Sequence, residues 1–172
     1  MQVATLVIAV AGVTLAALSL GWQAATFVLT GGRVKVELRV GAMHGTASHM
    51  VTQSVSSGLP DPERLQADGY TRPVVAVQVR NVGRMAVTVE DWSLFTSPGS
   101  RIALQPVGQS IGPPLPHRLE AGATGTWAVE LAPVRAMRAA TVAALKVPEE
   151  RIKIRGKVGL GDGRTVETRE AL

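Results

Sequence analysis

The sequence of 172 residues contains no cysteine, which excludes disulfide bonds, zinc–thiolate sites and cysteine nucleophiles. Aromatic residues make up only 3% of the chain, and no cluster of them is visible on which nucleic-acid bases would stack. The 18 Lys and Arg outnumber the 13 Asp and Glu, but this net charge of +5 is spread along the chain, apart from one basic segment near the C-terminus. Nucleic acid is therefore not an expected partner.

Charged side chains are missing altogether from residues 1–32. A bilayer core about 30 Å thick requires roughly 20 apolar residues of helix. Residues 3–21 supply 19, or about 28 Å at a rise of ~1.5 Å per residue. Trp22 follows at the depth where aromatic rings lie among lipid headgroups, and Gly31 and Gly32 end the helix. We therefore predict that this segment forms a retained transmembrane helix followed by a short Gly-Gly join.

Two alternative interpretations of the segment are less favoured. A cleaved signal peptide begins with positive charge and has an apolar run of 7–15 residues, whereas no Lys or Arg precedes this longer run. A buried helix of a soluble protein is usually shorter than the uncharged stretch found here.

The charges that flank the apolar segment predict its orientation. Arg33, Lys35 and Arg39 follow the segment, opposed only by Glu37, and no cation precedes it. Because cytoplasmic flanks carry the excess of Lys and Arg, we predict a single-pass protein of the cell membrane with its C-terminal domain in the cytoplasm. An extracytoplasmic domain is the alternative. Arg33 and Lys35, together with Trp22, are expected at the membrane interface.

Small residues recur along the predicted transmembrane helix. Gly12 and Ala16 are four positions apart, and Ala17, Gly21 and Ala25 form a second row with the same spacing. Such rows allow two helices to approach closely in lipid, so they are candidates for a helix-packing surface in a homo-oligomer. The alternative is that Ala and Gly are simply frequent in membrane helices, and we favour it.

The rest of the chain, residues 33–172, is predicted to be one mainly β domain. Apolar and polar residues alternate with period two in several short segments, which is typical of half-buried strands. Frequent turn signals separate these segments and favour an antiparallel sandwich with Trp92 and Trp127 in its core. One crossover helix is expected at 133–146. The predicted strands are residues 33–40, 73–80, 85–94, 102–107, 124–131, 151–160 and 164–169.

Residues 41–71 are predicted to be mostly loop. The first part is rich in Gly, Ser, Thr and His, and residues 59–70 contain two prolines and a glycine. A weak, irregular strand near residues 50–55 is the alternative for the first part.

Residues 75–84, VAVQVRNVGR, and the following Val87-Thr88-Val89 resemble the strand–turn–strand of immunoglobulin-like domains. The runs at 115–122 and 158–164 are similar to those of uncharacterised actinobacterial membrane-anchored proteins. These proteins pair a short apolar N-terminal segment with such a domain. The resemblance covers most of the chain and implies an immunoglobulin-like β-sandwich, but it implies no activity. The cysteine pair of antibody domains is missing here, and the helix at 133–146 departs from a plain seven-stranded sandwich.

Motifs of catalysis and metal binding are weak in this sequence. Residues 108–112 match G-x-S-x-G, but a nucleophile elbow needs a helix after Ser110, and three prolines follow within six residues. His44 and His49 lack a third ligand at a defined spacing. We therefore predict a protein that is not an enzyme, with no catalytic residue, no metal site and no cofactor.

The most informative charged feature is the predicted strand at 151–160. Its alternation places Arg151, Lys153, Arg155 and Lys157 on one face, where four like charges repel unless another group answers them. One interpretation is an anionic partner, either acidic lipid headgroups or an acidic protein.

Two structural interpretations of the same face compete with that one. Lys and Arg on an edge strand prevent sheet-to-sheet aggregation. Alternatively, Glu130, Glu167 and Glu170 on neighbouring strands neutralise the cations.

Together these features predict a membrane-tethered, non-catalytic binding or scaffolding module. Its expected partners are the lipid bilayer and a protein whose identity the sequence does not reveal. The alternative is an accessory structural subunit of a larger membrane protein assembly, held through its transmembrane helix.

Overall fold

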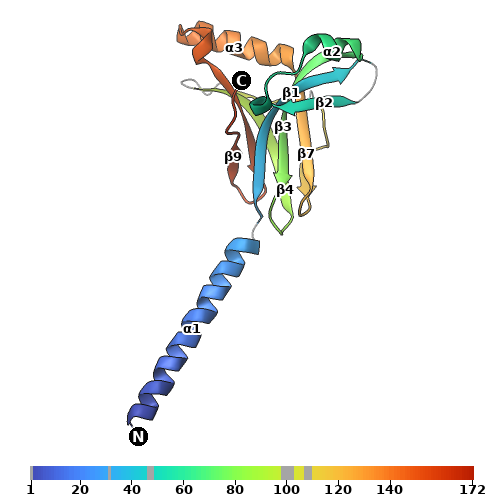
Figure 1. The fold of residues 1–172 in the computed structure, drawn as a ribbon. Coiled ribbons are helices and arrows are strands. Elements are labelled where there is room, and N and C mark those ends of the chain that lie inside the picture. Colours follow the sequence, from blue (N-terminus) through green and yellow to red (C-terminus); the bar gives the residue numbers. More distant parts are fainter. Residues whose placement is uncertain (1, 31, 46–48, 98–102, 107–109) are drawn as a thin grey trace.

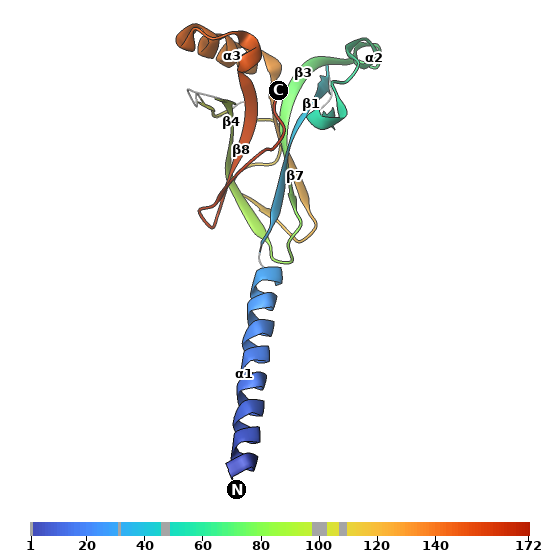
Figure 2. The same ribbon diagram turned by 60° about the vertical axis from the view of Figure 1, so that its left-hand side comes forward.

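The computed structural model describes residues 2–30, 32–45, 49–97, 103–106 and 110–172. A long helix, α1 (Gln2–Thr30), projects from one end of a β-rich body (Figure 1). We call residues 32–172 the β domain. Helices α2 (Pro62–Ala67) and α3 (Leu131–Leu145) lie at its far end, and a turned view shows the same arrangement (Figure 2).

Within the described residues, the strands form two antiparallel sheets. The first has the order β2-β1-β3-β7, and the second has the order β5-β4-β8-β9, with β6 pairing with β4. The first sheet is made of β1 (Val34–His44), β2 (Met50–Ser54), β3 (Tyr70–Asn81) and β7 (Thr124–Glu130). The second sheet is made of β4 (Val87–Ser97), β5 (Ala103–Leu104), β6 (His117–Leu119), β8 (Lys153–Leu160) and β9 (Thr165–Glu167).

The inner faces of the two sheets share one apolar core. Val75, Val77 and Val79 of β3 are fully buried, and they belong to the same cluster as Trp92 of β4 and Trp127 of β7. Alternation along each strand sends every second side chain inward, so the period-two pattern of the sequence is enough to specify this face. The predictions of antiparallel strands and of two core tryptophans are confirmed.

Helix α3 connects β7 of the first sheet to β8 of the second. It begins two residues before the predicted range of 133–146, with Pro133 in its first turn. Val134, Met137 and Thr141 are its buried face and close the far end of the core. Lys146 ends the helix in a left-handed conformation, with φ of 52°.

The prediction that residues 41–71 are mostly loop is wrong. Strand β1 continues to His44, and β2, a 3-10 turn (Val55–Ser57) and α2 occupy most of the remaining segment. The alternative of a strand near residues 50–55 is confirmed by β2. Helix α2 begins where Asp61 accepts a hydrogen bond from the backbone N–H of Glu63, with Pro62 in the first turn. Proline is a frequent loop residue, but it also suits the first turn of a helix, as it does here.

Two other strand predictions need correction. The strand expected at 102–107 is only β5 in the described residues, and positions 102 and 107 lie outside them. Strand β6, which pairs with β4 from Val87 to Val89, was not among the predicted strands.

Candidate functional site

Helix α1 exposes a predominantly apolar, uncharged surface. The segment Leu6–Thr26 spans 21 residues, is long and apolar enough to cross a membrane, and buries none of its surface in the protein. The hydroxyls of Thr14 and Thr26 donate to the carbonyls of Val10 and Trp22, at 2.8 and 2.7 Å. These polar groups are therefore satisfied inside the helix, as a lipid environment requires.

The chain that follows α1 is attached directly to the β domain. The backbone N–H groups of Val82 and Gly83 donate to the carbonyl of Arg33, at 2.8 and 3.1 Å. The guanidinium of Arg164 donates to the carbonyl of Gly32 at 2.8 Å. We call this end of the β domain, formed by residues 32–35, 82–86 and 161–164, the helix-proximal end. It is the end from which α1 projects (Figures 1 and 2).

The three predicted interface residues are spread along this junction. Trp22 is 76% exposed and lies eight residues before the end of α1, which is about 12 Å along the helix axis. Arg33 and Lys35 are exposed at the start of β1. Lys35 forms an ion pair with Glu37, 2.7 Å from Nζ to Oε1. The helix thus continues beyond Trp22 for two turns before the cations appear.

The predicted helix-packing residues lie on the exposed surface of α1. A Cβ atom built on Gly12 or Gly21 would have no atom within 4 Å. Ala16, Ala17 and Ala25 are exposed as well. Their role in self-association remains a prediction.

The basic strand face is present, with one correction. Lys153, Arg155 and Lys157 of β8 alternate with buried residues and point away from the core. Arg151 was expected in the same strand, but it belongs to a 3-10 turn (Glu149–Arg151) that precedes β8.

The edge-protection interpretation of this face is wrong, because β8 lies between β4 and β9 and is not an edge strand. Of the three carboxylates expected to answer the cations, Glu167 lies opposite Lys157 in the strand register. Glu130 instead forms an ion pair with Arg72 in the first sheet. The Nε atom of Arg155 is buried and has no hydrogen-bond partner among the described residues.

Geometry also separates the two anionic partners considered for this face. Strand β8 (Lys153–Leu160) runs from the end of the domain where α3 lies toward the helix-proximal end (Figure 2). Seven residues of strand cover about 23 Å, whereas the Debye length is about 8 Å at physiological ionic strength. A lipid surface at the helix-proximal end would therefore act little on Lys153.

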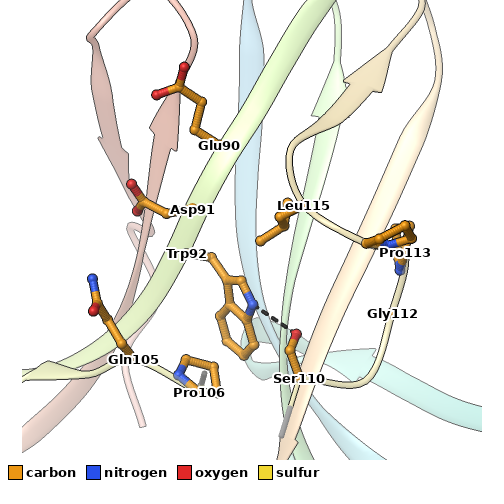
Figure 3. A pocket seen from close by; sticks show the side chains of 10 residues that line it. Glu90, Asp91, Trp92, Gln105, Pro106, Ser110, Gly112, Pro113 and Leu115 are labelled. Atoms are coloured by element: carbon orange, nitrogen blue, oxygen red, sulfur yellow. Dashed lines mark hydrogen bonds between the residues drawn. The ribbon is translucent and has the colours of Figure 1, made fainter. Parts of the chain in front are cut away.

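A pocket of about 480 Å³ holds Ser110, Glu90 and Asp91 on the second sheet (Figure 3). The Ser110 hydroxyl accepts a hydrogen bond from the Trp92 indole at 3.0 Å. His117 does not line this pocket and packs edge-on against Trp127 instead, with the ring centroids 5.8 Å apart.

Ser110 does not have the setting of a nucleophile elbow. No helix follows it, and Ile111 instead forms a bridge with Ala128, as the prolines predicted. Gly108 and Gln109 lie outside the described residues. The hydroxyl thus accepts a hydrogen bond from the Trp92 ring. Among the described residues that line the pocket, none is a histidine.

Two further cavities were missed by sequence reasoning. One, of about 500 Å³, lies at the far end between β1, β3, α2 and α3, and Leu59, Leu65 and Tyr70 line it. It was missed because the composition of residues 59–70 indicates a loop. The other, which we call the basic cleft, lies at the helix-proximal end and has a volume of about 520 Å³.

The basic cleft brings together cations from the two ends of the β domain sequence. Arg33 and Lys35 line one side, and Arg164 and Arg169 line the other. These two segments lie about 130 residues apart in the chain, so no spacing motif signals their meeting. Only the packing of the two sheets against each other places the start of β1, in the first sheet, near β9, in the second.

The electrostatics of the cleft are shaped by Asp162. Its carboxylate accepts hydrogen bonds from the side chain and the backbone N–H of Arg164, which hold the pKa of Asp162 below its ordinary value. The same contact raises the pKa of Arg164. The guanidinium is thereby fixed in place between Asp162 and the carbonyl of Gly32.

Known proteins give no further guidance to this site. No protein-family model matches the sequence, and no curated protein and no solved structure matches it either. Within the described residues, no group of three or more His, Asp or Glu side chains is placed to hold a metal ion.

Proposed function

We propose that this protein is a membrane-tethered, non-catalytic binding module. Helix α1 spans the bilayer once, and the β domain is held at the membrane surface as the binding part. The observation that carries this proposal is the contrast between the fully exposed apolar segment Leu6–Thr26 and a β-domain core that is closed without it. Exposed hydrocarbon of this length is costly in water and favourable in lipid.

We also propose that the β domain is immunoglobulin-like. In immunoglobulin folds, the first, second and fifth strands share one sheet, and the third, sixth and seventh share the other. If β1, β3, β4, β7, β8 and β9 are taken as strands A, B, C, E, F and G, the sheet orders agree with this scheme. Trp92 on β4 then takes the place of the buried tryptophan of strand C. Helix α3 replaces the usual E–F loop.

The orientation belongs to the same proposal. Arg33, Lys35 and Arg39 follow α1, whereas no Lys or Arg precedes it. The positive-inside rule supports a cytoplasmic β domain.

Membrane extraction of the full-length chain tests the tether. We expect the protein to remain in the membrane fraction after alkaline carbonate or high-salt washing, and to require detergent for release. A truncated chain of residues 33–172 provides the comparison, since it keeps every residue of the core. Release of the full-length chain by carbonate would contradict the proposal.

The alternative, an accessory subunit of a membrane assembly, is supported by the open surface of the small-residue rows on α1. Crosslinking in native membranes followed by pull-down distinguishes the two. A partner captured by the truncated chain favours the binding module. A partner that needs α1, and is lost in a Gly12→Leu/Gly21→Leu variant, favours the assembly subunit.

A further inference from the structure

The basic cleft carries an excess of positive charge. Four cations, Arg33, Lys35, Arg164 and Arg169, line it against two carboxylates, those of Glu167 and Glu170. Two of the cations are also paired with carboxylates just outside the lining, Lys35 with Glu37 and Arg164 with Asp162. The β fold does not require this excess, because the hydrophobic core lies elsewhere and most of the cleft's cations are exposed. An anionic ligand would add a partner for these cations, above all for Arg169, which forms no ion pair within the described residues.

The position of the cleft relative to α1 narrows the source of that ligand. Only residue 31 separates the end of α1 at Thr30 from Gly32. Consecutive Cα atoms are about 3.8 Å apart, so Arg33 lies within about 12 Å of the last helical residue. The uncharged stretch runs to residue 32, so α1 can insert as far as Thr30. The cleft then lies against the headgroup layer, and Trp22 lies about 12 Å deeper in the bilayer.

The arginines of the cleft are suited to a phosphate group. The Arg164 guanidinium is already ordered by Asp162 and the Gly32 carbonyl, so less conformational freedom is lost when it binds. Arg169 forms no ion pair within the described part of the chain. Guanidinium groups bind phosphate oxygens through paired N–H donors, which gives both affinity and orientation.

Apolar side chains beside the cations favour an amphiphilic ligand over a free anion. Val34 and Val82 line the cleft, and Val82 is 55% exposed. Met85, in the same loop as Val82, is 58% exposed. Such residues have little use beside a soluble phosphate, but they fit the glycerol and first acyl carbons of a lipid.

We propose that the basic cleft binds the headgroup of an anionic phospholipid from the leaflet in which α1 ends. Arg164 and Arg169 contact the lipid phosphate, and Val34 and Val82 contact its glycerol region. The lipid fixes the orientation of the β domain on the membrane. This inference rests on the proposed tether, because α1 must hold the cleft at the bilayer.

Lipid binding to the full-length chain in neutral detergent tests the inference. Native mass spectrometry measures the affinity for short-chain phosphatidylglycerol, with phosphatidylcholine of the same chain length as the zwitterionic comparison. We expect selective binding of phosphatidylglycerol. The Arg164→Gln/Arg169→Gln variant loses the attraction of two cations to the anionic headgroup. Its affinity for phosphatidylglycerol should therefore be about 30-fold lower than that of the unchanged chain.

A matched control removes the same charge elsewhere. Lys146→Gln/Lys153→Gln lowers the net charge by the same two units, at the end of the β domain where α3 lies. Its affinity should change by less than about threefold, because the site is screened from the cleft. Asp162→Asn provides an independent variant that keeps all four cations of the cleft. It removes the negative charge beside Arg164 and also one of the contacts that order its guanidinium, so phosphatidylglycerol binding should change far less than in Arg164→Gln/Arg169→Gln.

The possible outcomes distinguish a lipid ligand from a free anion, and failure of the cleft from failure of the tether. Equal affinity for phosphatidylcholine and phosphatidylglycerol, or equal losses in the cleft and control variants, would overturn the inference. Displacement of the lipid by millimolar inorganic phosphate would assign the cleft to a free anion and also overturn it. Selective binding by a chain that carbonate extracts from membranes would refute the tether and leave the cleft intact. Carbonate resistance without lipid selectivity would refute only the cleft.

Discussion

Helix α1 and the β domain use the same apolar residue types with opposite exposure. Leu15 of α1 is 69% exposed, whereas Leu38 of β1 is fully buried. In the β domain, alternation turns valines and leucines inward and leaves charged residues outside. In α1, exposed apolar residues predominate, and no charged residue occurs. The difference shows that the two regions are built for different solvents, water around one and hydrocarbon around the other.

The largest difference between the two regions is expected when a leucine in each of them is replaced by alanine. Leu38→Ala should lower the free energy of unfolding of the β domain by about 2–5 kcal/mol, because it leaves a cavity in the core. Leu15→Ala should leave that free energy unchanged. Denaturant titration of the full-length chain in detergent, followed by tryptophan fluorescence, measures both. A similar loss in the two variants would mean that α1 packs against the β domain.

Replacing two similarly exposed leucines, one in each region, with a charged residue tests whether lipid or water surrounds each of them. Leu15 and Leu59 are 69% and 72% exposed. Leu15→Arg should disfavour membrane insertion by about 2.5–3.5 kcal/mol, the cost of Arg near the centre of a transmembrane helix. Leu59→Arg, on the β domain, should have no effect on insertion. The carbonate-resistant fraction measures the difference, and equal behaviour would place α1 in water.

Features of the fold that depend on neighbouring residues in the sequence can be predicted, whereas features that depend on residues far apart in the sequence cannot. The unbroken apolar run and the alternating strands are local patterns, so α1, the core tryptophans and the basic face of β8 can all be found from sequence. Helix α2 was missed because the proline that starts it is also a common turn residue. Arg151 was misplaced because alternation does not reveal where a 3-10 turn ends and a strand begins.

The basic cleft was beyond the reach of any local pattern. Its cations meet only because the start of β1 lies near β9, and nothing in either segment specifies that proximity. The interior position of β8 was likewise undetermined, since strand order depends on the fold as a whole. Sequence periodicity reports which face of a strand is buried, but not which strand lies beside it.

Replacing one glycine in each region with alanine compares how closely other atoms pack around the two positions. A Cβ on Gly156 of β8 would lie 2.6 Å from Cγ2 of Val77 in the facing sheet, whereas a Cβ on Gly12 would have no neighbour within 4 Å. Gly156→Ala should therefore lower the free energy of unfolding by about 1–3 kcal/mol through overpacking. Gly12→Ala should not change it. Denaturant titration of each variant in detergent measures the two effects.

The control for this prediction lies in the same contact. Val77→Ala combined with Gly156→Ala removes the clashing methyl group and should recover part of the stability that Gly156→Ala loses. Full additivity of the two losses would show that the sheets do not approach closely at this point.

Lowering the pH should affect the stability of the β domain but not the membrane retention of α1, and this is the smallest of the expected effects. Residues 2–30 of α1 contain no titratable side chain, so its membrane retention should not depend on pH between about 3 and 7. In the β domain, contact with Arg164 lowers the folded-state pKa of Asp162 below its unfolded value of about 4. The stabilisation it provides is present above that unfolded pKa and is lost as the pH falls through the lowered folded pKa. Asp162→Asn should flatten this part of the stability profile in thermal melts of the full-length chain. If stability fell equally steeply at low pH in the variant, the contact between Asp162 and Arg164 would not persist in solution.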